Sequence, residues 1–235
     1  PADAPQGATR GPRHAAARLT TAERPGAVYA ITGNLYPYGP VDGPMTEDLP
    51  DAATDHKGVL RARLWADALA AHRAGRARVV EVRSSDFVGP GVGANGHVSR
   101  VVPAALRGRA VTMIGRTDLS HSFTDVQDAA RTLVAAAADP GALGRTWHTP
   151  RTPPCTRREA LPARLARVGP PPVRVRSLRG PGLAVAGLFS PLLRELRDLA
   201  YQWEHPYVLD DTAARNRFSI EPTPWDEVCR RTARG

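Results

Sequence analysis

Polar side chains follow two short apolar runs of this 235-residue chain, and both sets lie in loops rich in glycine and proline. The first run, 26–32, continues into a loop that carries Asn34 and Tyr38, and the second, 77–85, continues into a loop that begins with Asp86. If the runs are parallel strands, their carboxyl ends meet at one edge of a sheet, where loops diverge around a ligand. The polar groups would then hang over a pocket for a small molecule. The alternative is that both segments are ordinary connections.

The elements that must position these loops alternate between strand and helix. Apolar residues at helical spacing predict helices over 57–75 and 124–144. Shorter segments predict a helix over 98–108 and strands over 110–115 and 145–150. The order strand, helix, strand, helix, strand is typical of a parallel α/β sheet with right-handed crossovers.

Both ends of the chain differ from this central pattern. Residues 1–25 have little periodicity and are predicted to be a loose N-terminal segment. Residues 26–150 form the α/β portion. Residues 151–235 are predicted to be a smaller, mainly helical C-terminal subdomain, which contains a strand over 173–178 and helices over 192–204 and 225–232.

The net charge of +9 and the pI near 10.6 raise nucleic acid as a partner. The charge is diffuse, however, because Lys57 is the only lysine and the arginines are spread along the chain. Aromatic residues make up only 6%, whereas a nucleic-acid face clusters its cations and interleaves them with aromatic rings. We therefore expect biased composition rather than a nucleic-acid partner.

Two cysteines, Cys155 and Cys229, stand far apart in the sequence without a histidine or cysteine at metal-ligand spacing. This argues against a disulfide scaffold and against a metal site. The chain has no apolar run of about 18 residues and no signal-peptide pattern, which predicts a cytoplasmic protein without membrane contact.

The order of several segments resembles a known family. "TGNLYPYGP" and "TEDLP" precede the first helix, and "VRSSDFVGPG" and then "SHSFTDVQDAA" follow it. This order is similar to that of the NAD-dependent epimerase/dehydratases, which are extended short-chain dehydrogenase/reductases, over about residues 26–230. The resemblance implies a partial Rossmann-like parallel sheet, NAD or NADP as cofactor, a nucleotide-sugar substrate, and a homodimer that docks through helices beside the sheet.

The resemblance also implies roles for individual residues on the substrate side. Asn34 falls where relatives place a hydroxyl that binds the reacting oxygen of the substrate. Tyr38 matches a Tyr-Gly pair, and Asp86 lies in the loop that relatives place near the substrate. Phe123 and Asp128 match the element near the nucleotide portion. The alternatives are that Tyr38 only packs and that Asp128 only solvates a helix face.

On the cofactor side, the resemblance implies that Arg83 and Gly89 border the nicotinamide. Glu47 and Pro50 match an acidic-proline signature of the same family. Arg83 has an alternative role, because it can pair with Glu81 on the same side of its strand.

One departure from the family pattern concerns proton transfer. Relatives carry a Tyr-x-x-x-Lys pair on one helix face, where the ammonium lowers the pKa of the phenol. In this chain the pair falls on Lys57 and Arg61, so the tyrosine is absent. Lys57 acts as a base only if its pKa is lowered, whereas an arginine stays charged. The alternative is that Lys57 is a solvated cation at the start of its helix.

A second departure concerns the pyrophosphate site. Relatives begin with a Gly-x-x-Gly-x-x-Gly turn, which no segment of residues 1–30 matches, and the glycines of 89–96 precede no clear long helix. We therefore expect a truncated enzyme that lacks roughly the first hundred residues of the family domain, and both an active and an inactive enzyme stay open. The main hypothesis is an NAD(P)-dependent epimerase/dehydratase-like oxidoreductase, and the alternative is a non-catalytic nucleotide- or sugar-binding protein on the same fold.

Overall fold

The central layer of the protein is a three-stranded parallel sheet. In the computed structural model, residues 17, 19–24, 26–160, 174–180, 182 and 198–234 are described. The sheet has the order β1-β2-β7 and consists of β1 (Val28–Asn34), β2 (Arg78–Ser84) and β7 (Thr146–His148). Within the described residues, β1 has a neighbouring strand on one side only.

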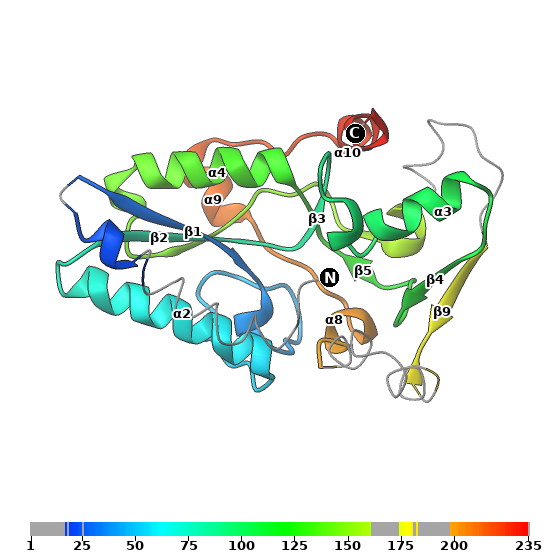
Figure 1. Ribbon diagram of the computed structural model, residues 1–235, viewed down its shortest axis with the longest axis horizontal. Helices are drawn as coiled ribbons and strands as arrows, with labels where there is room; N and C mark the ends of the chain where they lie inside the picture. The colour runs from blue at the N-terminus through cyan, green and yellow to red at the C-terminus, as the bar shows by residue number, and fades with distance from the viewer. Residues whose placement is uncertain are drawn as a thin grey trace.

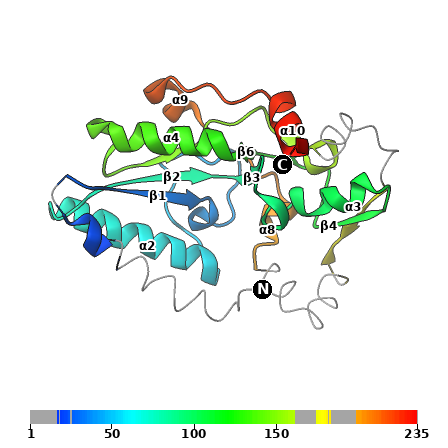
Figure 2. The same cartoon turned by 45° about the horizontal axis from the view of Figure 1, so that its top comes forward.

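Helices cover both faces of this sheet. The crossover helix α2 (His56–Arg73) lies on one face, while α4 (Val126–Ala138) and α9 (Thr212–Phe218) lie on the other (Figure 1). Figure 2 shows the same three layers from a second direction. The predicted α/β class and the Rossmann-like arrangement of parallel strands and helices are confirmed.

The two faces of β2 follow from the alternation of its side chains. Val79 packs with Trp65 and Ala68 of α2, whereas Val80 and Val82 pack against the opposite layer. Successive side chains of a strand point to opposite faces, so a strand buried on both sides reads as a continuous apolar run. This is why the segment 77–85 could be recognised as a central strand.

Aspartates fix where the two long helices begin. The side chain of Asp55 accepts hydrogen bonds from the backbone N–H groups of Lys57 and Gly58, and Asp125 does the same for Gln127 and Asp128. Such caps satisfy N–H groups that have no partner inside the helix. Because α4 begins at residue 126, the segment 124–125 belongs to the preceding strand instead of to the predicted helix.

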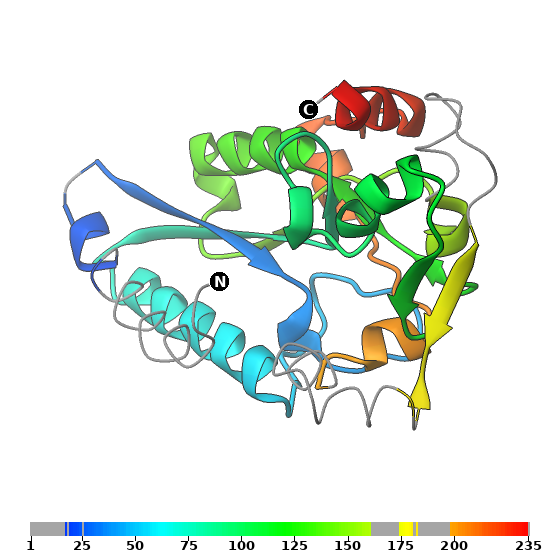
Figure 3. The same cartoon turned by 45° about the vertical axis from the view of Figure 1, so that its right-hand side comes forward.

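Beyond the carboxyl ends of β1 and β2, the chain forms small two-stranded sheets. Figure 3 shows β4 and β9 side by side, away from the main sheet. The strand pairs are parallel β3 (Asp86–Val88) with β6 (Phe123–Asp125), parallel β4 (Val111–Ile114) with β9 (Val175–Leu178), and antiparallel β5 (Ser120–His121) with β8 (Cys155–Thr156).

The remaining described helices are short. They are η1 (Tyr36–Tyr38), η2 (Gly93–Asn95), η3 (Ser99–Val101), α3 (Val102–Leu106), η4 (Pro140–Ala142), α8 (Tyr201–Glu204) and α10 (Trp225–Arg234). No described helix is long and apolar enough to cross a bilayer.

The C-terminal part of the chain pairs and packs with elements of the central part. Strands β8 and β9 pair with β5 and β4, and α9 packs against α4 and β7. The predicted strand over 173–178 and the predicted helix over 225–232 are present, whereas 192–197 lies outside the described residues, as do 1–16. The division into 26–150 and 151–235 stays a prediction.

Candidate functional site

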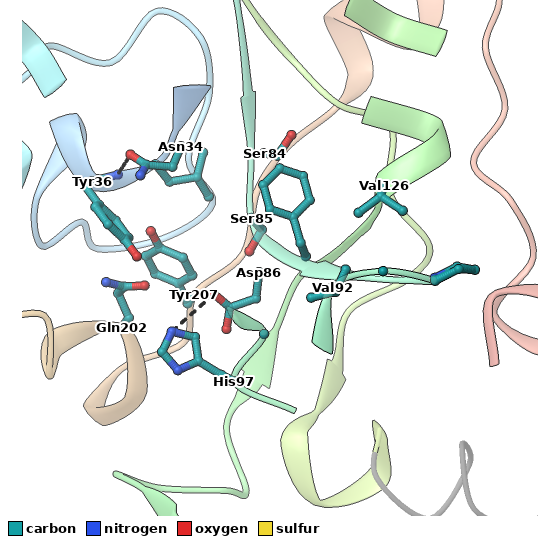
Figure 4. A pocket seen from close by; sticks show the side chains of 15 residues that line it. Asn34, Tyr36, Ser84, Ser85, Asp86, Val92, His97, Val126, Gln202 and Tyr207 are labelled. Carbon is teal, nitrogen blue, oxygen red and sulfur yellow. Dashed lines mark hydrogen bonds and ion pairs between the residues drawn. The ribbon is translucent and has the colours of Figure 1, made fainter. Parts of the chain in front are cut away.

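A pocket of about 420 Å³ lies where β1 and β2 end and β3 begins. Figure 4 shows polar side chains around it that come from β1, η1, the loop after β3 and α8. Its polar lining includes the side chains of Asn34, Tyr36, Asp86, His97, Gln202 and Tyr207.

Asn34 and Asp86 reach this pocket because their strands are in register. Asn34 ends β1 and pairs with Ser84, which ends β2, and Asp86 follows two residues later. The side-chain oxygen of Asn34 accepts a hydrogen bond from the backbone N–H of Tyr36 at 3.2 Å, which holds the turn into η1. The two glycine- and proline-rich loops therefore converge on one pocket, as the parallel arrangement predicted.

Asp86 is the acidic group of the pocket, and two histidines hold it. Its carboxylate lies 3.0 Å from Nε2 of His121 and 3.9 Å from Nε2 of His97. Burial alone would raise the pKa of Asp86, but the two imidazoles and the guanidinium of Arg157 hold that pKa well below its usual range. Asp86 is therefore an ionised hydrogen-bond acceptor at the pocket.

His97 also faces the pocket, and its ring packs edge-on against Trp203 with 4.6 Å between the ring centroids. Burial lowers the pKa of His97, with Arg100, His121 and Arg157 acting in the same direction against the attraction of Asp86. At neutral pH the imidazole is thus uncharged, so it can both donate and accept a hydrogen bond.

Two phenols line the pocket opposite Asp86. Burial, followed by the carboxylate of Asp86, raises the pKa of Tyr36 to about 12, while the positive charge of Arg61 acts in the opposite direction. Burial also raises the pKa of Tyr207 well above its ordinary value. Both phenols are therefore protonated hydrogen-bond donors at neutral pH.

The other predicted substrate residues lie outside this pocket. Tyr38 is buried, and its hydroxyl lies 2.8 Å from Nε2 of His148. Phe123 packs in the hydrophobic core beside Trp225. Asp128 is buried rather than solvated, because its carboxylate accepts hydrogen bonds from the backbone N–H and the hydroxyl of Thr223. These three side chains hold the fold together around the site.

The residues predicted to border a cofactor have structural partners of their own. Arg83 is buried and forms ion pairs with Glu81 at 2.8 Å and with Asp51 at 2.7 Å. Its guanidinium also lies 4.7 Å from the ring centroid of Tyr38. Gly89 has φ of +119° and allows the chain to pass close to Val126 at the start of α4, next to the lining residue Pro90.

Lys57 and Arg61 lie in the first two turns of α2, beside the pocket rather than among its lining residues. Lys57 is half-buried and Arg61 is exposed. Arg61 still acts on the pocket through its charge, which lowers the pKa of Tyr36. The phenol that Arg61 influences is thus on η1, whereas Lys57 and Arg61 are on α2. The proton-transfer role of Lys57 and Arg61 stays a prediction.

Sequence reasoning missed several lining residues. Tyr36 stands two positions from Asn34 in the same quoted loop, and His97 directly follows the second glycine-rich loop, so proximity to these loops was an available signal. Gln202 and Tyr207 carried no such signal, because they lie more than a hundred residues later. Gln202 belongs to the predicted amphipathic helix over 192–204, and Tyr207 follows that helix.

The sequence was then compared with known families. A profile of the NAD-dependent epimerase/dehydratase family matches residues 10–147, which is more than half of the chain. The chain belongs to this family. No curated protein sequence matches it at a significant level. The NAD-dependent epimerase/dehydratase assignment confirms the family that the segment order suggested.

Solved structures of similar fold come from sugar-nucleotide enzymes. A dTDP-glucose 4,6-dehydratase from Bacillus anthracis in complex with NAD has 16% identity and a TM-score of 0.73, covering 94% of this chain and 65% of its own. The corresponding enzyme from Streptomyces venezuelae has 19% identity and a TM-score of 0.74, covering 97% and 65%.

A UDP-glucuronic acid 4-epimerase from Bacillus cereus has 15% identity and a TM-score of 0.71, covering 91% of this chain and 63% of its own. At these identities the similarity establishes the fold. The chain spans about two thirds of the length of these family members. Among the described residues, no three histidine, cysteine, aspartate or glutamate side chains form a cluster that could hold a metal ion.

Proposed function

We propose that this chain is the substrate-side part of an NAD(P)-dependent epimerase/dehydratase-like oxidoreductase that acts on a nucleotide sugar. The observation that carries the proposal is the pocket at the carboxyl ends of β1 and β2, which Asn34 and Asp86 line together. Ligands of parallel α/β sheets bind at this edge. Assembly as a homodimer through the helices beside the sheet belongs to the same proposal.

The lining residues fit only part of a nicotinamide dinucleotide. Asn34, Ser84, Gln202 and Tyr207 offer neutral donors and acceptors that suit a carboxamide or ribose hydroxyls. Among the described residues, no lysine or arginine lines this pocket, so the described lining does not fit a pyrophosphate. A bound nicotinamide would supply hydride acceptance and donation. The residues of this chain would bind and orient the substrate beside it.

Proton handling in this proposal involves Tyr36 and the helix cations. The phenol of Tyr36 lines the pocket, and a pKa of about 12 makes it a proton donor rather than a base at neutral pH. Lys57 and Arg61 occupy the positions of the family pair, and Arg61 favours the ionised phenol by its charge. Asn34 would bind the reacting oxygen of the substrate.

The test mixes purified chain with NAD or NADP and either dTDP-glucose or UDP-glucose, and it measures both the nicotinamide absorbance and the formation of a new sugar nucleotide. Both readouts are needed because an epimerase or dehydratase returns the hydride and leaves no net change in the nicotinamide. Turnover is expected to fall at least about a hundredfold in Tyr36→Phe if the phenol donates the proton. Lys57→Met should also lower turnover while leaving substrate affinity nearly unchanged. If the wild-type chain produces neither an absorbance change nor a new sugar nucleotide with any of these cofactor and substrate pairs, the proposed activity is excluded for this chain.

A second candidate function is that of a non-catalytic nucleotide- or sugar-binding protein on the same fold. The pocket lining without lysine or arginine favours it, because such a lining leaves the cofactor pyrophosphate without a charged partner there. This alternative predicts that a sugar nucleotide raises the melting temperature of the chain without any absorbance change. In that case Lys57→Met leaves the thermal shift intact.

A further inference from the structure

Two of the most deeply buried polar side chains at the pocket have polar atoms without a partner. Gln202 is 1% exposed and Tyr207 is 4% exposed. Both amide atoms of Gln202 and the hydroxyl of Tyr207 have no hydrogen-bonding partner among the described residues. The amide of Gln202 lies beside the phenol of Tyr36 and lowers its pKa as a weak hydrogen-bonding neighbour, although the contact does not meet the distance and angle of a full hydrogen bond.

A buried polar atom without a partner is costly to the folded protein. Leaving a buried donor or acceptor unsatisfied costs about 1–3 kcal/mol, so most native structures avoid it. Three such atoms belong to two side chains that line the pocket, and Tyr207 also lines a second pocket of about 110 Å³ beside it. A ligand that reaches these atoms would supply the missing hydrogen bonds. Figure 4 shows Gln202 and Tyr207 together on the side of the cavity across from Val92 and Val126.

The backbone around Tyr207 fixes the direction of its hydroxyl. Its N–H donates to the carbonyl of Ser120, and its carbonyl accepts from the N–H of Ser122. The ring stacks on His121 with 5.3 Å between the centroids, and His121 in turn holds Asp86. The unpartnered hydroxyl is thus pre-positioned, which lowers the entropic cost of binding a ligand.

A sugar ring matches this set of groups. Gln202 offers a donor and an acceptor side by side, Tyr207 offers a donor, and ionised Asp86 offers an acceptor. Ring hydroxyls both donate and accept, so neighbouring hydroxyls can satisfy all three side chains. A carboxylate on the sugar would instead meet Asp86 with like charge, and no lysine or arginine in the described part of the chain lines the pocket to offset the repulsion.

We propose that Gln202 and Tyr207 form the recognition pair of this pocket and bind the hydroxyls of a neutral sugar ring. This inference rests on the proposed function, which supplies the statement that the sugar is attached to a nucleotide. It selects neutral hexoses over hexuronates through the charge of Asp86, and it assigns recognition of the ring hydroxyls to Gln202 and Tyr207.

The experiment measures the affinity of UDP-glucose, dTDP-glucose and UDP-glucuronate by calorimetry, together with the melting temperature of the free protein. The variants are Tyr207→Phe and Gln202→Met. Each should weaken binding of the neutral sugar nucleotide about tenfold, which corresponds to the loss of one hydrogen bond. Each should leave the melting temperature of the free protein equal or higher, because an unsatisfied buried group has been removed.

The matched control is Tyr201→Phe. The hydroxyl of Tyr201 is also buried without a partner among the described residues, but Tyr201 lines a separate pocket of about 110 Å³. This variant should change the melting temperature in the same direction while leaving the affinity for UDP-glucose unchanged. UDP-glucuronate should bind the wild type at least tenfold more weakly than UDP-glucose does.

The outcomes separate this inference from the proposed function. Binding that is about tenfold weaker in both variants, without turnover in the wild type, supports the inference and excludes the oxidoreductase. Turnover in the wild type with unchanged affinity in both variants supports the oxidoreductase and overturns the inference. A fall in the free-protein melting temperature of both variants, or equal affinity for UDP-glucuronate and UDP-glucose, overturns the inference as well.

Discussion

Buried histidines set the acid stability of this protein, and His148 is the clearest case. The side chain is fully buried, its Nδ1 donates to the carbonyl of Asp210 at 2.7 Å, and its Nε2 accepts from Tyr38. Burial is the largest influence and lowers the pKa of His148 to about 4, with Arg83 adding to the effect against the carbonyl and carboxylate of Asp210. The neutral imidazole is therefore the form that the folded state accommodates.

The sign of the pH dependence follows from this shift. The unfolded chain protonates His148 near pH 6.5, whereas the folded protein resists protonation until about pH 4. The contribution of His148 is hence complete above pH 6.5 and falls by about 3 kcal/mol as the pH drops to 4. We expect His148→Gln to reduce the slope of unfolding free energy against pH in this window, as measured by urea denaturation.

The control for His148 is Tyr38→Phe, which removes one hydrogen bond but leaves the imidazole buried. It should lower the unfolding free energy by about 1 kcal/mol at every pH and keep the slope. A His148→Gln protein with the wild-type slope would contradict the buried, neutral imidazole.

Residue types alone could not distinguish the side chains that line the pocket from the buried side chains that stabilise the fold around it. Tyr38, Phe123 and Asp128 have side chains suited to substrate contact, yet all three are buried in packing or hydrogen bonds. Arg83 was open between a cofactor role and pairing with Glu81, and the structure contains the ion pair. Burial depends on which distant segments cover a side chain, and a local sequence pattern does not contain that information.

At the scale of elements, one glycine allows the end of β4 to pack closely against α8, which carries Gln202. Gly115 follows β4 with φ of +70°, and a Cβ atom there would lie 2.4 Å from Cβ of Trp203. The next residue, Arg116, donates its N–H to the carbonyl of Trp203 at 2.8 Å. Close approach of the two backbones is thus possible only with glycine at this position.

We therefore expect Gly115→Ala to destabilise the protein by more than about 2 kcal/mol and to weaken sugar-nucleotide binding, because Trp203 must move and Gln202 is its neighbour. The measurements are urea denaturation and calorimetry. Gly75→Ala is the matched control, since Gly75 has the same φ of +70° but nothing within 4 Å of its added Cβ. It should cost only about 1 kcal/mol and leave binding unchanged. Equal effects of the two substitutions would contradict the contact with Trp203.

Elements with local signals were predictable from the sequence, whereas their long-range partners were not. Asn34 and Asp86 could be placed at one edge because each ends or follows an apolar strand, and α2 could be found from its apolar spacing. Tyr207 reaches the same pocket only because its backbone pairs with residues 120–122, some eighty-five positions earlier. Such pairing depends on tertiary contacts and leaves no periodic trace in the sequence.

At the scale of the whole molecule, the pocket lies between the main sheet and the smaller sheets. Residues from both 84–97 and 198–209 line it. The first segment continues from β2 and contains β3, which pairs with β6, and the second is held by backbone hydrogen bonds of Tyr207 to Ser120 and Ser122. A ligand in the pocket would bridge both segments. The helices α2 and α4 cover the main sheet and contribute only Val126 to the lining.

Hydrogen exchange tests this arrangement over the whole chain. With saturating UDP-glucose we expect slower amide exchange in 84–97 and 198–209, because ligand binding suppresses their local opening. Exchange in the central turns of α2 and α4 should stay unchanged. Duplex DNA is the control ligand, since the basic residues of this chain are diffuse and no segment-specific protection should result. Protection confined to the helices, or equal protection by DNA, would contradict a sugar-nucleotide site at the junction of the sheets.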